Sequence, residues 1–161
     1  MKQKLNCVLL IDDDEPTNFL SAMLIEEANC SRHVKVIPTG KEALSYLASS
    51  QQSKNDSLPY PELIFLDINM PAMDGWEFLD EYKALTKEHQ EKIIIIMLTT
   101  SLNPDDALRA FEIPEVSGFE NKPITREKLD RILKKYFSGH FKEPELREDN
   151  TDTVQQIFRT K

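Results

Sequence analysis

The sequence has few of the residues that mark several common functional classes. Only two of its 161 residues are cysteine, and Cys7 and Cys30 form neither a metal-ligand spacing nor a disulfide framework. A reduced, cytoplasmic setting is therefore the simplest expectation. Residues 1–4 lead into a short apolar run that ends in acids, which is not the pattern of a signal peptide, and no apolar run approaches membrane-spanning length.

Basic residues are also outnumbered. Lysine and arginine total 20 against 28 aspartates and glutamates, which gives a formal charge of −8. A nucleic-acid surface needs a clustered basic patch, so this balance argues against direct nucleic-acid binding and leaves protein partners open. A hydrophobic content of 40% and a charged content of 30% are ordinary for a soluble globular protein, and the length suits one domain with a tail.

Five apolar segments predict β-strands, at residues 5–11, 33–37, 63–66, 93–98 and 116–120. The segments 63–66 and 93–98 are continuously apolar, which predicts strands that are covered on both faces. The segment 33–37 alternates polar with apolar residues, as an edge strand does.

Five further segments predict helices. In four of them apolar residues recur at helical spacing, namely Phe19, Leu20, Met23, Leu24 and Ala28; Ala43, Leu44, Leu47 and Ala48; Trp76, Leu79, Tyr82 and Leu85; and Leu129, Ile132, Leu133, Tyr136 and Phe137. A short helix between the last two begins at the cap Asn103 and ends before Pro114, and Thr125 caps the final helix. The polar residues 49–61 predict an extended surface loop, and 88–92 a charged link.

The alternation of strands and helices predicts an α/β fold, a doubly wound, all-parallel sheet of five strands with five helices. All strands of such a sheet end on one edge, where ligands bind. In the flavodoxin-like order 2-1-3-4-5 the first and third strands adjoin, which brings Asp12 and Asp13 beside Asp67. Thr99 ends the fourth strand and Lys122 follows the fifth, so both should reach the same edge.

Carboxylates that crowd in this way need positive charge. Two unit charges ~4 Å apart repel by roughly 4 kcal/mol at an effective dielectric of ~20. Oxygen ligands without histidine or cysteine nearby select a hard cation, of which Mg²⁺ is the expected one. Together with the amine of Lys122 and the hydroxyl of Thr99, such a site suits phosphoryl transfer with Asp67 as the nucleophile.

These residues, in this order, resemble the receiver domain of two-component response regulators, in particular the stand-alone, chemotaxis-regulator-like kind. The resemblance runs from about Leu5 to Phe137 and rests on the acidic pair, on Asp67 with Met70-Pro71 and Asp74-Gly75 behind it, on Thr99, and on Lys122-Pro123. It implies that Asp67 accepts a phosphoryl group from a sensor histidine kinase or a histidine phosphotransfer protein, with Mg²⁺ as the cofactor. The domain would catalyse its own phosphorylation and dephosphorylation and would not be an enzyme in the usual sense.

The resemblance also implies how the metal is held. Asp13 would be a direct Mg²⁺ ligand and Asp12 mainly an outer-shell one, while Asp67 and the main-chain carbonyl of Asn69 would complete the set. Asp14, the next acid along the chain, would not be a ligand.

A switch is implied as well. Phe119 stands where receivers carry an aromatic residue that swings inward on activation, and Pro123 would follow a cis peptide bond. The face made by the fourth helix, fifth strand and fifth helix would then change shape and bind a downstream protein target. The oligomeric state stays open, with a homodimer among the options.

Under this interpretation residues 1–138 form the receiver domain and residues 139–161 a polar tail, with no output domain. The polar stretch 49–61 and the run Thr99-Thr100-Ser101 resemble stand-alone regulators that partner phytochrome-type kinases. Thr100 departs from the Ala or Gly of many receivers, which predicts tighter access to the phosphoryl group.

Other interpretations fit parts of the pattern. The acids after the first strand could be only a helix-capping cluster, Thr99 a strand end, Lys122 a solvated lysine and Phe119 plain core. Phosphatases of the haloacid dehalogenase type also use an aspartate nucleophile, but they need Asp-x-Asp-x-Thr/Val after the first strand, and Pro16 holds the last place here. A pseudo-receiver is disfavoured by the intact acceptor set, and a flavodoxin by the lack of a phosphate-binding loop.

Overall fold

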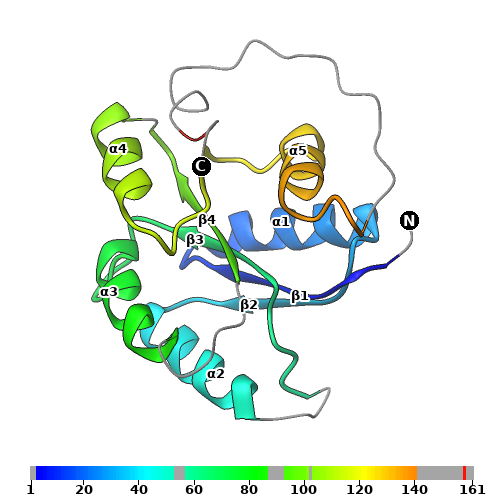
Figure 1. The fold of residues 1–161 in the computed structure, drawn as a ribbon, viewed down its shortest axis with the longest axis horizontal. Helices are drawn as coiled ribbons and strands as arrows, with labels where there is room; N and C mark the ends of the chain where they lie inside the picture. The colour runs from blue at the N-terminus through cyan, green and yellow to red at the C-terminus, as the bar shows by residue number, and fades with distance from the viewer. Residues whose placement is uncertain (1–2, 53–56, 87–92, 102, 141–157, 159–161) are drawn as a thin grey trace.

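The computed structural model describes residues 3–52, 57–86, 93–101, 103–140 and 158 of the chain. At its centre lies a parallel sheet of five strands in the order β2-β1-β3-β4-β5 (Figure 1). The strands are β1 (Leu5–Ile11), β2 (Ser31–Ile37), β3 (Leu63–Asp67), β4 (Ile94–Thr99) and β5 (Gly118–Asn121). The predicted α/β fold and strand order are therefore confirmed.

The three central strands carry the apolar runs of the sequence. Every residue of β3 and β4 is buried, whereas β2 at the edge is half-exposed, as its alternating pattern predicts. Ile11 at the end of β1 lies opposite Leu66 of β3, so the two strands end side by side. This register brings the residues that follow β1 next to the last residue of β3.

Helices cover both faces of the sheet. They are α1 (Glu15–Ala28), α2 (Gly40–Gln52), α3 (Gly75–Thr86), α4 (Pro104–Glu112) and α5 (Arg126–Tyr136). Figure 1 shows α1 and α5 on one side of the sheet and α2 and α3 on the other; α4 contributes Ala107 and Ala110 to the core on the α2–α3 side. Among the helices that the structure describes, none combines the length and the apolarity needed to cross a lipid bilayer.

A side-chain oxygen caps the start of each of the five helices, and at α2 and α3 the capping residues are Thr39 and Asp74. Oδ2 of Asp14 accepts from the backbone N–H of Thr17 at 3.0 Å, and Oδ1 of Asn103 accepts from that of Asp105 at 2.9 Å. Oγ1 of Thr125 accepts from the N–H of Lys128 at 3.2 Å. The predicted caps Asn103 and Thr125 are thus confirmed, and each satisfies a backbone donor that the first turn leaves without a helical partner.

The apolar spacing of α1 does not mark its buried side. Phe19 and Leu20 are 67% and 58% exposed, whereas Asn18 and Ser21 are buried. Asn18 faces inward because the main-chain carbonyl of Asp12 needs a hydrogen-bond donor there, and Nδ2 of Asn18 donates to it at 2.8 Å. An outward-facing apolar patch is therefore left on α1, made of Phe19, Leu20 and Met23.

The predicted surface loop 49–61 was wrong in part. Helix α2 continues to Gln52, and the buried Ser50 donates its hydroxyl to the carbonyl of Leu47 at 3.1 Å. On the returning segment the carbonyl of Pro59 accepts from the Tyr46 hydroxyl at 2.6 Å, which ties the chain back to α2. Residues 53–56 and 88–92, the latter predicted to be a charged link, lie outside the described residues.

Candidate functional site

The carboxyl ends of four strands place polar side chains at one edge of the sheet. Asp12 follows β1, Asp67 ends β3 and Thr99 ends β4, and all three are buried. The backbone N–H of Lys122, just after β5, donates to the carbonyl of Thr99 at 2.7 Å, which anchors this residue beside β4. The predicted convergence on one edge is therefore present.

A buried ion pair forms the centre of this site. Nζ of Lys122 lies 2.6 Å from Oδ2 of Asp12 and 3.1 Å from Oδ1 of Asp67. The two aspartate side chains are each 5% exposed and the lysine side chain 12% exposed. Lys122 is consequently not a solvated loop lysine, because its charge offsets two carboxylates that would otherwise be buried without a cation.

The charge on these groups is set by burial and by one another. Burial, followed by the negative charge of Asp12, raises the pKa of Asp67 to about 6, although Lys122 acts in the opposite direction. For Lys122, burial lowers the pKa, but the hydrogen bonds and charges of Asp12 and Asp67 outweigh it, so its pKa is raised. Lys122 therefore stays protonated, while Asp67 changes between its protonated and ionised forms at a pH of about 6 in the metal-free protein.

Three carboxylates converge closely enough to share a cation. One oxygen each of Asp12, Asp13 and Asp67 lies within 4.8 Å of the others, with Asp13 on the exposed side. Oδ2 of Asp12 is buried and accepts no hydrogen bond of ordinary geometry among the described residues, although Nζ of Lys122 is close. That contact is an ion pair. An all-oxygen donor set of three carboxylates, with one lysine to offset their charge, fits Mg²⁺.

Thr99 and Asn69 are held by their own loops. Oγ1 of Thr99 donates to the carbonyl of Ser101 at 3.0 Å and accepts from the Ser101 N–H at 3.2 Å. The N–H of Asn69 donates to Oδ1 of Asp67 at 3.4 Å, a long contact. The hydroxyl of Thr99 is therefore engaged with the loop after β4.

The two expected switch residues are Pro123, which follows Lys122 at this edge of the sheet, and Phe119, which lies within β5. The Lys122–Pro123 peptide bond is cis, in agreement with the expectation from the resemblance. Phe119 is 1% exposed and its ring lies in the core under α4, stacked on Phe158 from the end of the chain. In the sequence Phe158 belongs to a small apolar group with Val154 and Ile157, which did not predict this contact.

Two further residues shape the site: Gly75, which the sequence analysis used only as part of a motif, and Lys128, which it missed. A Cβ atom on Gly75 would lie 2.7 Å from the carbonyl oxygen of Asp67, so only glycine lets α3 start this close to β3. Nζ of Lys128 donates to the carbonyls of Asn121 and Pro123 at 3.0 and 3.1 Å and clamps the loop that carries Lys122. A lysine in the first turn of a helix opposes the helix dipole, and that position was a usable signal for Lys128.

A family model supports the same assignment. The model of the response regulator receiver domain matches residues 8–134. The chain belongs to the receiver domain family of response regulators. Receiver domains are signalling modules of two-component systems, which agrees with the predicted family.

Individual proteins with similar sequences or structures are response regulators as well. The response regulator Rcp1 of Synechocystis sp. is 30% identical over 106 residues, which cover 66% of this receiver domain chain and 69% of that protein. A two-component response regulator from Cytophaga hutchinsonii has a TM-score of 0.76 and 30% identity, covering 84% of this chain and 99% of the other. The bacteriophytochrome response regulator AtBRR has a TM-score of 0.67 and 27% identity, covering 91% and 99%. The expected similarity to regulators associated with phytochromes is thereby confirmed.

Proposed function

We propose that this receiver domain accepts a phosphoryl group on Asp67 from a phosphohistidine of a sensor histidine kinase or a histidine phosphotransfer protein. The observation that carries the proposal is the position of Asp67, whose Oδ1 lies 3.1 Å from Nζ of Lys122 in a cluster of three carboxylates. A carboxylate, an amine and a hydroxyl on one sheet edge are the parts that phosphoryl transfer needs, because positioning and charge neutralisation supply most of the catalysis.

The chain's own contacts favour one oxygen of Asp67 as the reacting atom. The described contacts of the Asp67 carboxylate, from Lys122 and from the N–H of Asn69, both use Oδ1. Oδ2 is therefore the oxygen that would attack phosphorus. The new P–O bond forms as the P–N bond of the donor breaks, and the departing imidazole keeps the electron pair and takes up a proton. Lys122 would hold the carboxylate and neutralise charge on the phosphoryl oxygens.

Asp13, Asp67 and the main-chain carbonyl of Asn69 would hold Mg²⁺, with Asp12 acting mainly through a water molecule. The bound ion would supply neutralisation of the phosphoryl charge. Asp13 is the exposed member of the cluster, which suits a site that exchanges metal with solvent.

The expected readout is a rearrangement of Thr99 and Phe119. A phosphoryl group adds about −1.5 to −2 charges at Asp67, which gives the Thr99 hydroxyl a stronger acceptor than the carbonyl of Ser101. Movement of Thr99 draws the loop after β4 inward, and the face of α4, β5 and α5 changes with it. A downstream protein would read that face.

The apolar patch on α1 supports a protein donor. Phe19, Leu20 and Met23 are 67%, 58% and 42% exposed on the helix that begins directly after the acidic pair. Exposed apolar patches of this kind mark protein contacts. The patch lies on the helix that follows the acids, so a kinase or phosphotransfer protein docked there would bring its phosphohistidine toward Asp67. By analogy with AtBRR, a phytochrome-type kinase is the proposed donor class.

The test is labelling by a small phosphodonor. The wild-type protein, incubated with acetyl phosphate and Mg²⁺, should gain the mass of one phosphoryl group, and Asp67→Asn should gain none. Asp80→Asn is the matched control, because the Asp80 side chain is 76% exposed on α3. Stoichiometric labelling of Asp67→Asn, or steady turnover of a phosphomonoester by the wild type, would overturn the proposal.

A further inference from the structure

The side chain of Phe158 is almost completely covered, although it comes from the end of a polar stretch. It is 3% exposed and packs on the face formed by α4, β5 and α5. Its ring stacks on that of Phe119, with 6.4 Å between centroids and 1° between planes, and meets Phe111 of α4 edge-on at 5.8 Å and 73°. These are the preferred geometries of aromatic pairs.

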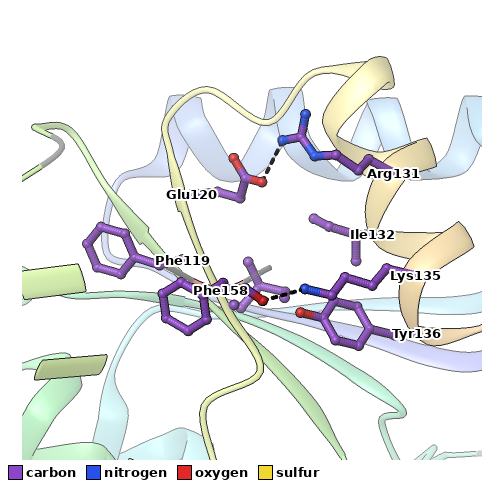
Figure 2. Close-up of a pocket in the computed structure, with 9 residues that line it drawn as sticks. Phe119, Glu120, Arg131, Ile132, Lys135, Tyr136 and Phe158 are labelled. Atoms are coloured by element: carbon purple, nitrogen blue, oxygen red, sulfur yellow. Dashed lines mark hydrogen bonds and ion pairs between the residues drawn. The ribbon is translucent and has the colours of Figure 1, made fainter. Parts of the chain in front are cut away.

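A polar contact fixes the main chain of the same residue. Nζ of Lys135 on α5 donates to the carbonyl oxygen of Phe158 at 2.8 Å (Figure 2). Two aromatic contacts and one hydrogen bond therefore fix the position of Phe158. A bound ligand is held in the same way, by an apolar anchor and a polar group that orients it.

Phe158 also forms one wall of a small cavity between β5 and α5, hereafter the Phe158 pocket, whose other walls include Ile96, Phe119, Ile132, Lys135 and Tyr136. Gly118 forms part of its floor, where a Cβ atom would lie 2.8 Å from Cδ1 of Ile96. A cavity of about 40 Å³ remains beside the ring of Phe158. The contact between the ring and this face therefore leaves unfilled space beside it.

We propose that Phe158 is an intramolecular ligand that covers the α4–β5–α5 face, and that a partner binds this face by putting an aromatic side chain of its own in the place of the Phe158 ring, against Phe119 and Phe111. Seventeen residues, 141–157, separate Phe158 from His140, the last residue described before it. A tether of that length holds a ligand at an effective concentration of the order of millimolar, so a free competitor must exceed that level or bind more tightly.

One part of this proposal, the release of Phe158 on phosphorylation, rests on the proposed function. Phe119 forms a wall of the Phe158 pocket and lies on β5, three residues before Lys122 of the acceptor site. If phosphorylation of Asp67 moves Phe119, the stacking partner of Phe158 moves with it and the tail is released. Docking of Phe158 itself does not require phosphorylation, so the two proposals are tested apart.

The experiment compares full-length proteins without phosphodonor. Phenylalanine rings are labelled with ¹³C, and ring signals are followed by NMR in the wild type, Phe158→Ala and Phe19→Ala, the last being the same change on an exposed side chain of α1. We expect Phe119 and Phe111 signals to shift in Phe158→Ala and to stay in place in Phe19→Ala. Lys135→Met, which keeps an apolar stem and removes the donor, is a second variant in case Phe158→Ala does not fold, and it should shift the same signals in the same direction.

A peptide of residues 151–161 then serves as the probe. It should restore the wild-type Phe119 signal of Phe158→Ala, and a peptide with alanine at position 158 should not. When binding is followed by the signals of the labelled peptide itself, the wild type should require at least about tenfold more protein than Phe158→Ala for half-saturation, because the tethered ring competes. Intramolecular docking would be overturned if the Phe119 and Phe111 signals were unchanged in both Phe158→Ala and Lys135→Met, or if the peptide restored nothing. It would also be overturned if dilution of the wild type moved these signals to their positions in Phe158→Ala, because the contact would then form between two molecules. Loss of labelling at Asp67 with the ring shifts intact would overturn only the proposed function.

Discussion

Lys122 and Asp67 come from different strands, yet Nζ of the lysine lies 3.1 Å from Oδ1 of the aspartate with both side chains largely buried. The pair joins the end of β3 to the residue after β5 across the intervening strand β4. It makes the proposed nucleophile and its charge partner one unit, and several measurable consequences follow from it.

Removal of the lysine charge should slow phosphorylation more than it disturbs the fold. Lys122→Met leaves the site without the cation nearest to Asp67, and loss of one such charge-stabilising donor costs about 10²-fold in rate. The rate of labelling by acetyl phosphate with Mg²⁺ checks this. Lys83→Met, at an α3 lysine whose side chain is 38% exposed, should label at the wild-type rate. Equal rates for the two variants would contradict the role given to Lys122.

The stability of the metal-free protein should depend on the charge of Asp67. The pKa of this group is raised from 3.8 to about 6, so its ionisation opposes folding: stability is fully present below about pH 4 and is lost as the pH rises through about 6. In EDTA at pH 7.5, Asp67→Asn should be about 1–3 kcal/mol more stable than the wild type. Urea unfolding from pH 4 to pH 8 measures the difference, which should shrink toward pH 4. A difference that is constant across this range would contradict the assignment.

Magnesium should stabilise the protein through the carboxylate cluster. Binding to the folded state alone raises the free energy of unfolding by about 2.7 kcal/mol at a hundredfold excess over the dissociation constant. Asp13→Asn removes the exposed carboxylate of the cluster and should reduce the rise in Tm that MgCl₂ produces. Asp80→Asn should keep the full rise. The same rise in both variants would place the ion elsewhere.

Glycine at position 75 should be required by the contact between α3 and β3. In Gly75→Ala the new Cβ would meet the carbonyl oxygen of Asp67 at 2.7 Å and Cα of Ile68 at 3.0 Å, and backbone atoms cannot give way as a side chain can. We expect a loss of about 1–3 kcal/mol in urea unfolding and slower labelling of Asp67. Gly139→Ala is the control, because nothing lies within 4 Å of its added Cβ.

The hydroxyl of Thr99 should be needed for the readout and less for the chemistry. Thr99→Ala should still be labelled, while the change that phosphorylation produces in Trp76 fluorescence should be lost; Thr99→Ser should keep both. Trp76 is the single tryptophan, and the guanidinium of Arg109 on α4 lies 4.2 Å from the centre of its ring, so a shift of α4 alters its surroundings. A normal fluorescence response in Thr99→Ala would exclude the hydroxyl as the trigger.

Much of the site was predictable because strand ends are easy to locate in a parallel sheet. The apolar runs before Asp12, Asp67 and Thr99 stop abruptly, and parallel pairing then requires these ends to meet at one edge. Lys122 was predictable for the same reason, because it follows a strand of the same sheet. No comparable rule gives the depth of each side chain or its hydrogen-bond partner.

The misses have separate physical causes. On α1 the predicted apolar set divides between two sides: Leu24 and Ala28 pack against the core, whereas Phe19, Leu20 and Met23 face outward and Asn18 is turned inward by its bond to the carbonyl of Asp12. Helix α2 includes Ser50, whose buried hydroxyl bonds to a carbonyl within its own helix, and a polar composition does not indicate such burial. Phe158 belongs to a small apolar group with Val154 and Ile157 in an otherwise polar stretch, but closure of a long segment costs little more than closure of a shorter one, so its docking position could not be deduced.

Strand β5 spans only Gly118–Asn121, with Phe119 under the Phe158 ring and Lys122 just past its far end. A movement of β5 would thus reach both Lys122 at the acceptor site and Phe119 under the Phe158 ring. Substitutions around position 158 should therefore change which proteins can compete for this face, while the acceptance of a phosphoryl group by Asp67 stays intact.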